Sequence, residues 1–432
     1  MKLVKMSLVA AMVMGASAFA IDNVKVDGDA KLYYITNNAG ANNLFSKNGT
    51  ASSADTALRL GVTGDLMKGV SFGVTGYAVS TLGLENNLVS NTFTGGRNGV
   101  ADNAWLGEAW LATTMGKTTA KVGRMSLDTP LAFSETWSVV PNTFEAAVLI
   151  NQDIPDTTLV GAWVGKGNGY NVGQGTFANA GHPSGLGYAN SPTPIGIDGI
   201  MGKSAAFGTF ADGGAYAVAA VNNSLKFLTA QAWYYNVVNV ADAYWLQADW
   251  DCQLVKNAKV GVQYADISPK GLLNGVKDSS AYAAKVGYEG VKNLKVSAAY
   301  SKADQDGAIK IANVATNNLQ VAQSKLYTEA FWNYGYVGNP DARTYALAGE
   351  YNAGIANVGA QYTDVSIGTS NTTSITAVGG KAADTKMKEA AVYASKDFGP
   401  LNATLAYFST KATDQDANKR YDSVLAMFKV KF

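Results

Sequence analysis

The chain is short of the residues from which most catalytic and structural sites are built. It has one cysteine, Cys252, and one histidine, His182, among 432 residues. A single cysteine excludes an internal disulfide framework and a cysteine-based zinc site, and a single histidine excludes a cluster of histidine ligands. An enzyme of the barrel phospholipase or protease kind would need a nucleophile with a histidine or paired carboxylates. We therefore expect a protein that is not an enzyme.

The chain also lacks an excess of basic or acidic residues, and it lacks long hydrophobic runs. Lys+Arg is 34 and Asp+Glu is 33, so the formal net charge is +1, whereas a nucleic-acid-binding protein normally shows a basic excess. Charged residues make up 16% of the chain, against about 25% in an average soluble domain. No segment after the N-terminus contains 18 continuous apolar residues, so no membrane-spanning helix is expected. We predict no nucleic-acid partner.

The first twenty residues have the three parts of a secretory signal peptide. Lys2 and Lys5 form a positive start, residues 8–14 are apolar, and Ala18-Phe19-Ala20 fits the small-x-small cleavage site. The sequence therefore predicts a signal peptide over residues 1–20 and an exported domain over residues 21–432.

Period-two alternation of apolar and polar residues dominates the rest of the chain. In residues 24–32, for example, Val24 and Val26 alternate with Lys25 and Asp27, which places them on opposite faces of a strand. The alternation predicts 18 strands, with 16 as an alternative, at 24–35, 56–64, 70–80, 104–113, 118–124, 143–151, 157–165, 214–221, 226–235, 241–251, 258–266, 281–288, 293–301, 343–351, 355–364, 387–396, 400–409 and 421–432.

The connections between these segments are of two kinds. Tight turns join many of them in pairs, and longer polar stretches separate the pairs, at 36–55, 81–103, 125–142, 166–213, 267–280, 303–342, 365–386 and 410–420. Short periplasmic turns and long extracellular loops are the plan of a bacterial outer-membrane barrel. A soluble β-sandwich is the alternative, but its dry core could not hold the many charges on the second strand face. We predict an all-β, transmembrane antiparallel β-barrel with a water-filled lumen.

The last strand and the tyrosines agree with a barrel in lipid. Tyrosines lie near the ends of apolar strand faces, where aromatic girdles mark the membrane interface. The chain ends in an amphipathic strand closed by Phe432. A terminal phenylalanine resembles the signature of proteins folded by the barrel-assembly machinery. We therefore predict Phe432 as an assembly signal, with that machinery and outer-membrane lipid as partners.

Several local motifs resemble a known family. Gly123-Arg124, then Thr129-Pro130, then the run Pro141-Asn142-Thr143-Phe144-Glu145 resemble the major outer-membrane porins of Campylobacter-type bacteria and, more distantly, the OprD-like porins of pseudomonads. The resemblance implies an 18-stranded channel whose third loop folds into the pore. The campylobacterial porins imply a general diffusion channel that forms a homotrimer, and the OprD-like porins imply substrate-selective uptake.

Pore function would rest on pore width and on charges in the lumen. The third loop, residues 125–142, carries Asp128 and Glu135 but no basic residue after Arg124. We predict a constriction in which these carboxylates face wall cations, formed by Asp128, Glu135, Arg124, Arg59 and Lys31. Strand parity places further pore-wall charges at Lys25, Asp27, Asp29, Glu108, Lys121, Glu145, Asp249, Lys259, Lys285, Lys295, Glu350 and Glu389.

The favoured function is an outer-membrane porin for passive diffusion of ions and small hydrophilic solutes, with weak cation preference from the loop carboxylates. Two alternatives stay open: a substrate-selective OprD-like channel, and a surface adhesin that uses the long loops. Two Asp-x-Asp pairs, at 304–306 and 414–416, lack the remaining ligands of a calcium loop. We predict no cofactor and no metal site.

Overall fold

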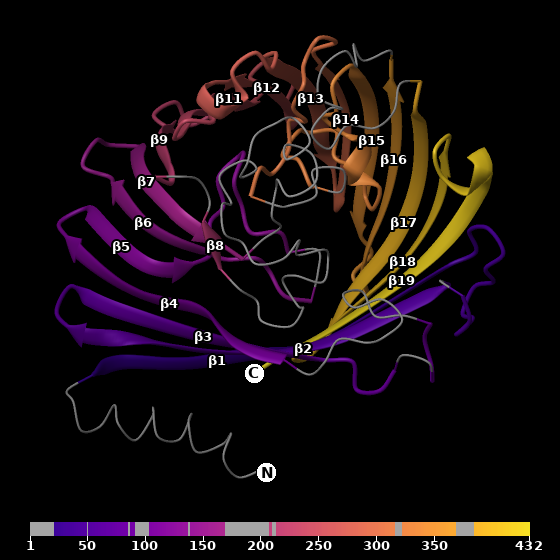
Figure 1. The fold of residues 1–432 in the computed structure, drawn as a ribbon, viewed down its shortest axis with the longest axis horizontal. Helices are drawn as coiled ribbons and strands as arrows, with labels where there is room; N and C mark the ends of the chain where they lie inside the picture. The colour runs from indigo at the N-terminus through magenta and orange to yellow at the C-terminus, as the bar shows by residue number, and fades with distance from the viewer. Residues whose placement is uncertain are drawn as a thin grey trace.

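The computed structural model describes residues 21–49, 51–84, 87–90, 103–136, 139–168, 207–209, 213–315, 322–368 and 384–432 (Figure 1). The predicted signal peptide, residues 1–20, lies outside the described residues and stays a prediction. Among the described residues, no helix is long and apolar enough to cross a membrane.

The described residues form a single antiparallel sheet that is closed on itself. Its strands are β1 (Asp22–Asn37), β2 (Ser52–Met67), β3 (Val70–Ser80), β4 (Asn103–Met115), β5 (Thr118–Met125), β6 (Phe144–Asn151), β7 (Thr157–Gly167), β8 (Gly208–Thr209), β9 (Ala215–Asn222), β10 (Leu228–Val237), β11 (Ala241–Asp251), β12 (Ala258–Pro269), β13 (Ser279–Val291), β14 (Leu294–Ala303), β15 (Ala342–Asn352), β16 (Asn357–Ile367), β17 (Lys386–Phe398), β18 (Leu401–Ala412) and β19 (Arg420–Lys431). Short 3₁₀ turns occur at η2 (Gly271–Leu273), η4 (Tyr334–Tyr336) and η5 (Asp416–Asn418).

The ring contains 18 strands, because β8 is a two-residue strand that pairs only with the end of β7, while β7 also pairs directly with β9. Strands β1 and β19 close the ring in a register that runs from Asp29 opposite Lys431 to Asn37 opposite Ser423. Each strand of the ring overlaps one segment predicted from the alternation. The 18-stranded antiparallel barrel is confirmed, and the 16-stranded alternative is wrong.

The two ends of the barrel differ as the sequence predicts. At one end, two-residue turns join β2 to β3, β13 to β14 and β17 to β18. Asn293 and Gly399 adopt positive φ in these turns (64° and 61°), the conformation that such tight turns require and that asparagine and glycine tolerate best. We call this the short-turn end and the other the long-loop end.

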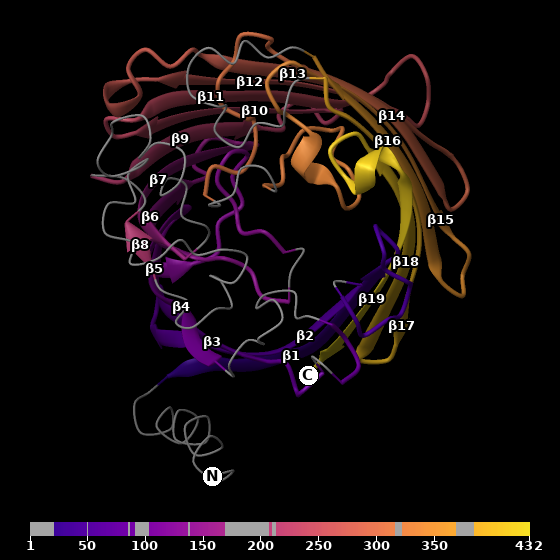
Figure 2. The same cartoon turned by 45° about the vertical axis from the view of Figure 1, so that its right-hand side comes forward.

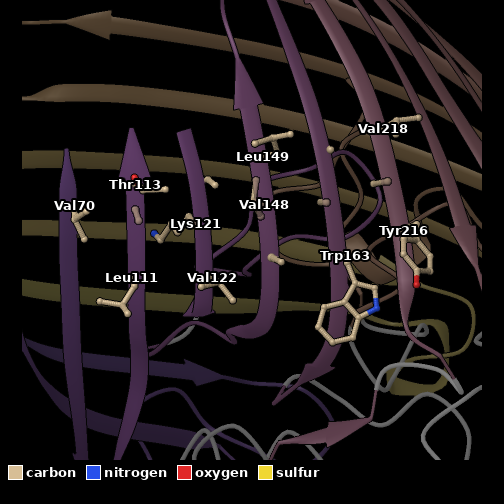
Figure 3. Close-up of a pocket in the computed structure, with 16 residues that line it drawn as sticks. Val70, Leu111, Thr113, Lys121, Val122, Val148, Leu149, Trp163, Tyr216 and Val218 are labelled. Carbon is tan, nitrogen blue, oxygen red and sulfur yellow. The ribbon is translucent and has the colours of Figure 1, made fainter. Parts of the chain in front are cut away.

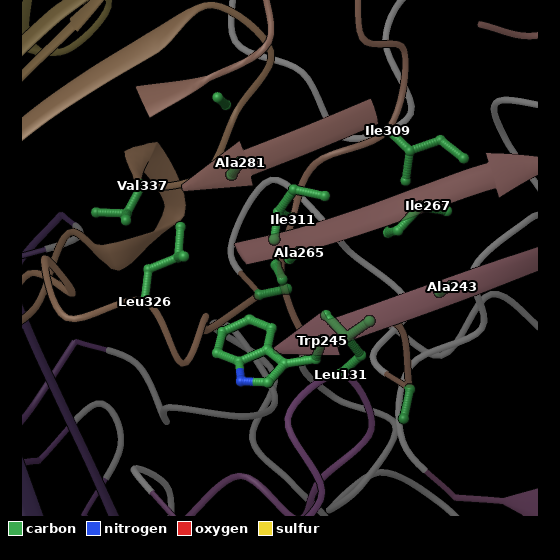
Figure 4. Packing of buried hydrophobic residues seen from close by; sticks show 14 of the residues in the cluster. Leu131, Ala243, Trp245, Ala265, Ile267, Ala281, Ile309, Ile311, Leu326 and Val337 are labelled. Atoms are coloured by element: carbon green, nitrogen blue, oxygen red, sulfur yellow. The ribbon is translucent and has the colours of Figure 1, made fainter. Parts of the chain in front are cut away.

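Two of the long connections do not stay at the rim. The described parts of the β5–β6 loop (residues 126–143) and of the β14–β15 loop (residues 304–341) lie inside the ring of strands (Figure 2). They form an apolar core with the inner faces of β10 to β13, in which Leu131, Trp245, Ile311 and Leu326 are almost fully buried (Figure 4). The two loops also reach other parts of the wall, where Val139 and Val140 pack against β2 and β3, and Phe331 and Trp332 pack against β18 and β19.

Candidate pore constriction

The β5–β6 loop is a compact hairpin held by its own side chains. Thr129 Oγ1 donates to the Ala132 carbonyl at 2.7 Å, and the Ser134 N–H donates to the Leu127 carbonyl at 2.8 Å. Asn142 then ties the outgoing limb to the incoming one: its Oδ1 accepts from the Glu135 N–H at 2.7 Å. Such side-chain to backbone bonds replace the ladder bonds that an irregular segment lacks.

The β14–β15 loop is anchored to the inner wall over a wide arc. Gln263 of β12 bonds the backbone of this loop twice, donating to the Lys325 carbonyl at 2.9 Å and accepting from the Tyr327 N–H at 3.0 Å. On the far side, the Glu389 carboxylate of β17 accepts from the N–H groups of Trp332 and Asn333, both at 2.9 Å. The loop is thus fastened to strands that lie well apart in the ring.

One asparagine of the β14–β15 loop joins the two loops. Asn313 accepts from the Phe133 N–H at 3.1 Å and donates to the Phe133 carbonyl at 2.8 Å, and it also donates to the Glu135 carboxylate at 3.1 Å. The Val314 N–H donates to the Leu131 carbonyl at 2.9 Å. These bonds hold the hairpin against the second loop, so the two act as one insert in the lumen.

The two predicted loop carboxylates have different environments. Glu135 is 5% exposed and accepts from Asn313 and from the Gln323 N–H, so its carboxyl group holds the two loops together. The Asp128 side chain is 84% exposed and forms an ion pair with Lys325 of the β14–β15 loop. Lys325 also lies over the Phe133 ring, 4.8 Å from its centroid. The exposed charges at the insert are therefore Asp128 and Lys325.

A buried ionisable group lies beneath this interface. The Glu329 carboxylate accepts from the Ser324 hydroxyl at 2.6 Å and from the Ser324 N–H at 3.1 Å. Its other oxygen is buried without a hydrogen-bond partner among the described residues. Burial raises the pKa of Glu329 to about 8, and the nearby buried Lys310 opposes that rise. Lys310 donates to the carbonyls of Ala322 and Gly335, at 2.8 and 3.0 Å.

The predicted wall cations Arg59 and Lys31 face the interior on the opposite side, on β2 and β1. Arg59 pairs with Asp27 and with Asp29, the latter through Nε at 2.7 Å. Lys31 lies directly across the strand pair from Lys429 of β19, a residue that the sequence analysis missed. Among the described residues, Asp128 pairs with Lys325 and with neither wall cation.

Further wall charges line the interior toward the short-turn end. A cavity of about 500 Å³ is lined by charged side chains of both signs. Tyr327 of the β14–β15 loop reaches this wall, where its hydroxyl donates to Asp249 at 2.6 Å and Lys285 lies over its ring. The strand register places most of the predicted wall residues on the inner face of the barrel: Lys25, Asp27, Asp29, Glu108, Lys121, Asp249, Lys259, Lys285, Lys295, Glu350 and Glu389. Of these, Glu389 is used as a loop anchor.

Arg124 and Glu145 differ from the prediction, because both lie on the outward face. They are cross-strand neighbours of β5 and β6, and Arg124 Nε lies 3.0 Å from Glu145. Exposed apolar residues with the same parity, Val122 and Leu149, line a hollow on the outer surface (Figure 3). The inward residues here are apolar instead, since Phe144 and its neighbours pack against the β5–β6 loop.

The sequence analysis also missed Lys325, Asn313 and Tyr327. One signal was present: residues 326–336 contain two phenylalanine or tryptophan and three tyrosine residues. An aromatic-rich stretch within a long polar loop indicates a segment that packs against protein rather than extending into solvent. Among the described residues, no cluster of three or more His, Cys, Asp or Glu could hold a metal ion.

Comparison with known proteins gives the fold. No family model and no curated protein matches the sequence. The structure is similar to that of Pseudomonas aeruginosa OccK8 (OprE), with a TM-score of 0.68, 16% identity, and coverage of 95% of this chain and 98% of that one. It is also similar to OpdK of the same organism, solved with vanillate (TM-score 0.67, 13% identity, 95% and 98% covered), and to OprD (0.66, 11%, 95% and 95%). The predicted resemblance to OprD-like porins is confirmed at the level of the fold.

Proposed function

We propose that this chain is an outer-membrane channel that passes small hydrophilic solutes and selects among them by charge. It would act without bond chemistry, and with outer-membrane lipid and the barrel-assembly machinery as partners. This differs from the general diffusion porin that the sequence favours. The observation that carries the proposal is the insert formed by the two loops, which narrows the lumen and exposes Asp128 and Lys325 there.

The charges around the insert favour anionic solutes. Glu135 and Glu389 are buried and hydrogen-bonded by loop N–H groups, so they face no solute. Asp29 is 4% exposed beside Arg59. Lys31, Lys325 and Lys429 are partly exposed, with Lys325 paired to Asp128 and Lys429 lying 4.0 Å from Asp29. This reverses the weak cation preference expected from the loop carboxylates alone, since charges at a narrow, partly dehydrated point dominate the field.

Planar-bilayer recordings test the proposal directly. In a potassium chloride gradient we expect single-channel steps and a reversal potential on the anion-selective side, with a preference that weakens as salt rises. Liposome swelling should be faster with benzoate, a small aromatic carboxylate like the vanillate in the OpdK structure, than with lysine, a cation of comparable size. Equal rates for benzoate and lysine would support a general porin instead. No conductance from folded protein would contradict the channel.

The remaining alternatives concern assembly and adhesion. A homotrimer stays a prediction from the campylobacterial resemblance, and step multiplicity in the same recordings would test it. An adhesin would use loops 166–213 and 303–342. The described part of the second loop packs inside the ring, which leaves it poorly placed for contact with another surface, so we favour the channel.

A further inference from the structure

A row of basic side chains crosses six neighbouring strands of the barrel at its long-loop end. We call it the outer basic row, and its members are Lys302, Arg343, Lys386, Lys388, Lys411 and Arg420. They lie on β14, β15, β17, β18 and β19, with only β16 contributing none.

The row points away from the lumen. Arg343 is exposed, whereas Thr344, the next residue along β15, is fully buried beneath the β14–β15 loop. On β17, Lys386 and Lys388 are exposed, and the intervening Met387 is fully buried. Since successive strand residues point to opposite faces, the basic side chains share the outer face.

The strand register places like charges directly opposite one another. Lys302 is paired with Arg343, Lys388 with Lys411, and Lys411 with Arg420. Like charges at directly opposed positions destabilise a sheet. The arrangement therefore costs stability unless an anion from the surroundings lies between these side chains.

Carboxylates of the chain do not balance the row. Asp364 of β16 pairs with Lys388 at 3.2 Å, and Asp422 lies on the outer face of β19 two residues from Arg420. Within the described part of the chain, the other five members of the row form no ion pair. Exposed Asp304 and Asp384 lie just beyond the ends of β14 and β17. Even with these, four acidic residues face six basic ones, and the excess is positive.

The row lies just beyond a band suited to lipid. Tyr300 and Tyr345 are the next outward residues after Lys302 and Arg343, and their ring centroids are 5.0 Å apart. Exposed Leu347 and Val392 follow toward the short-turn end. Aromatic girdles mark the membrane interface of barrels, so a residue one step beyond the girdle lies at the level of lipid headgroups.

Resting on the proposed membrane location, we propose that the outer basic row binds the phosphate groups of lipids in the leaflet at the long-loop end. Lipid phosphates would lie between the opposed cations and replace their repulsion by charge-assisted hydrogen bonds. The binding is confined to one arc. At the same end of β2 to β4, the outer face carries the uncharged residues Thr56, Ala78 and Ala104 beside an apolar hollow.

Native mass spectrometry of the detergent-solubilised protein tests this proposal. The probes are dimyristoyl phosphatidic acid, phosphatidylcholine of the same chain length, and inorganic phosphate. We expect retained adducts with phosphatidic acid and few with phosphatidylcholine. The row variant R343Q/K388Q/K411Q/R420Q should bind phosphatidic acid at least about tenfold more weakly, because each cation near an anionic lipid surface strengthens binding several-fold. The matched control is K68Q/K117Q/K256Q/K292Q, which removes four cations at the short-turn end. It should bind phosphatidic acid as the wild type does.

Heat-modifiable migration on gels would show that each variant is folded, and K388Q/K411Q replaces the row variant if the latter does not fold. Equal retention of phosphatidic acid by the row variant, or equal binding of the two lipids, would overturn the proposal. Displacement of phosphatidic acid by millimolar inorganic phosphate would also overturn it, because the row would then recognise a free anion. Conductance is a separate readout: a row variant with normal channels and normal lipid binding contradicts only this inference, whereas absent wild-type conductance contradicts the channel.

Discussion

Replacing Asp128 with asparagine should shift the channel toward anions by a calculable amount. Asp128 is largely exposed, and among the described residues its carboxylate forms an ion pair with Lys325 alone. An exposed ion pair contributes only about 0.2–1 kcal/mol to stability. The fold and the loop should therefore be retained, and the variant should report the removed charge rather than a rearranged lumen.

The size of the shift follows from Coulomb's law. A unit charge about 8 Å from a passing ion changes its energy by about 0.5 kcal/mol at the dielectric constant of water. Screening at physiological salt reduces this to about 0.2 kcal/mol. The change has opposite signs for potassium and chloride, so their permeability ratio should change about twofold at physiological salt and about sixfold at low salt. A lower effective dielectric in the constriction would increase both values.

The assay is the reversal potential of single channels in a potassium chloride gradient. Lys325→Gln should shift it toward cations, and the double variant D128N/K325Q should lie close to wild type because the net charge is restored. Asp153→Asn, in the exposed turn before β7, removes the same charge away from the insert and should change little. An unchanged reversal potential in Asp128→Asn, or the same shift in Asp153→Asn, would refute the placement of Asp128 at the constriction.

Two further variants address the buried glutamate and the closing strand. Burial raises the pKa of Glu329 from 4.5 to about 8, so the docked loop should lose stability as the pH rises from about 4.5 to about 8. Open-channel current noise should grow over that range in wild type and stay flat in Glu329→Gln; the same slope in both would contradict this assignment. Phe432 exchanges two backbone hydrogen bonds with Gly28, at 2.8 and 3.0 Å. Deleting Phe432 should therefore lower the heat-modifiable fraction in membranes with synthesis unchanged, and an undiminished fraction would remove its assembly role.

The alternation of the sequence predicted the strands because side-chain direction in a strand is a local property. Every strand of the ring was found, with ends that differ by only a few residues. The inward position of the β14–β15 loop could not be found this way. It depends on contacts such as that between Asn313 and Phe133, which are 180 residues apart, and no local pattern encodes such a pairing.

The errors at Arg124 and Glu145 have a different cause. The parity rule assigns apolar residues to lipid and polar ones to water, and it therefore placed Glu145 inside. At β6 the inner face is not wet, because Phe144 and Ala146 pack against Leu131 of the β5–β6 loop. Where a loop folds into the lumen, it gives the inner strand face an apolar surface to pack against, so apolar residues point inward there and polar residues point outward. Sequence reasoning succeeds where the interior is water-filled and fails where the loops make it a dry core.

The closure of β1 onto β19 also determines how the chain can reach its folded state. The register joins Asp29 to Lys431, so the last seam of the sheet requires residues about as far apart as the chain allows. Until that seam forms, β1 and β19 are two open sheet edges with unpaired N–H and C=O groups, which invite pairing with other chains. Sheets with such non-local pairings fold slowly. The newly made chain must therefore be kept from self-association until both ends of its sheet are available together.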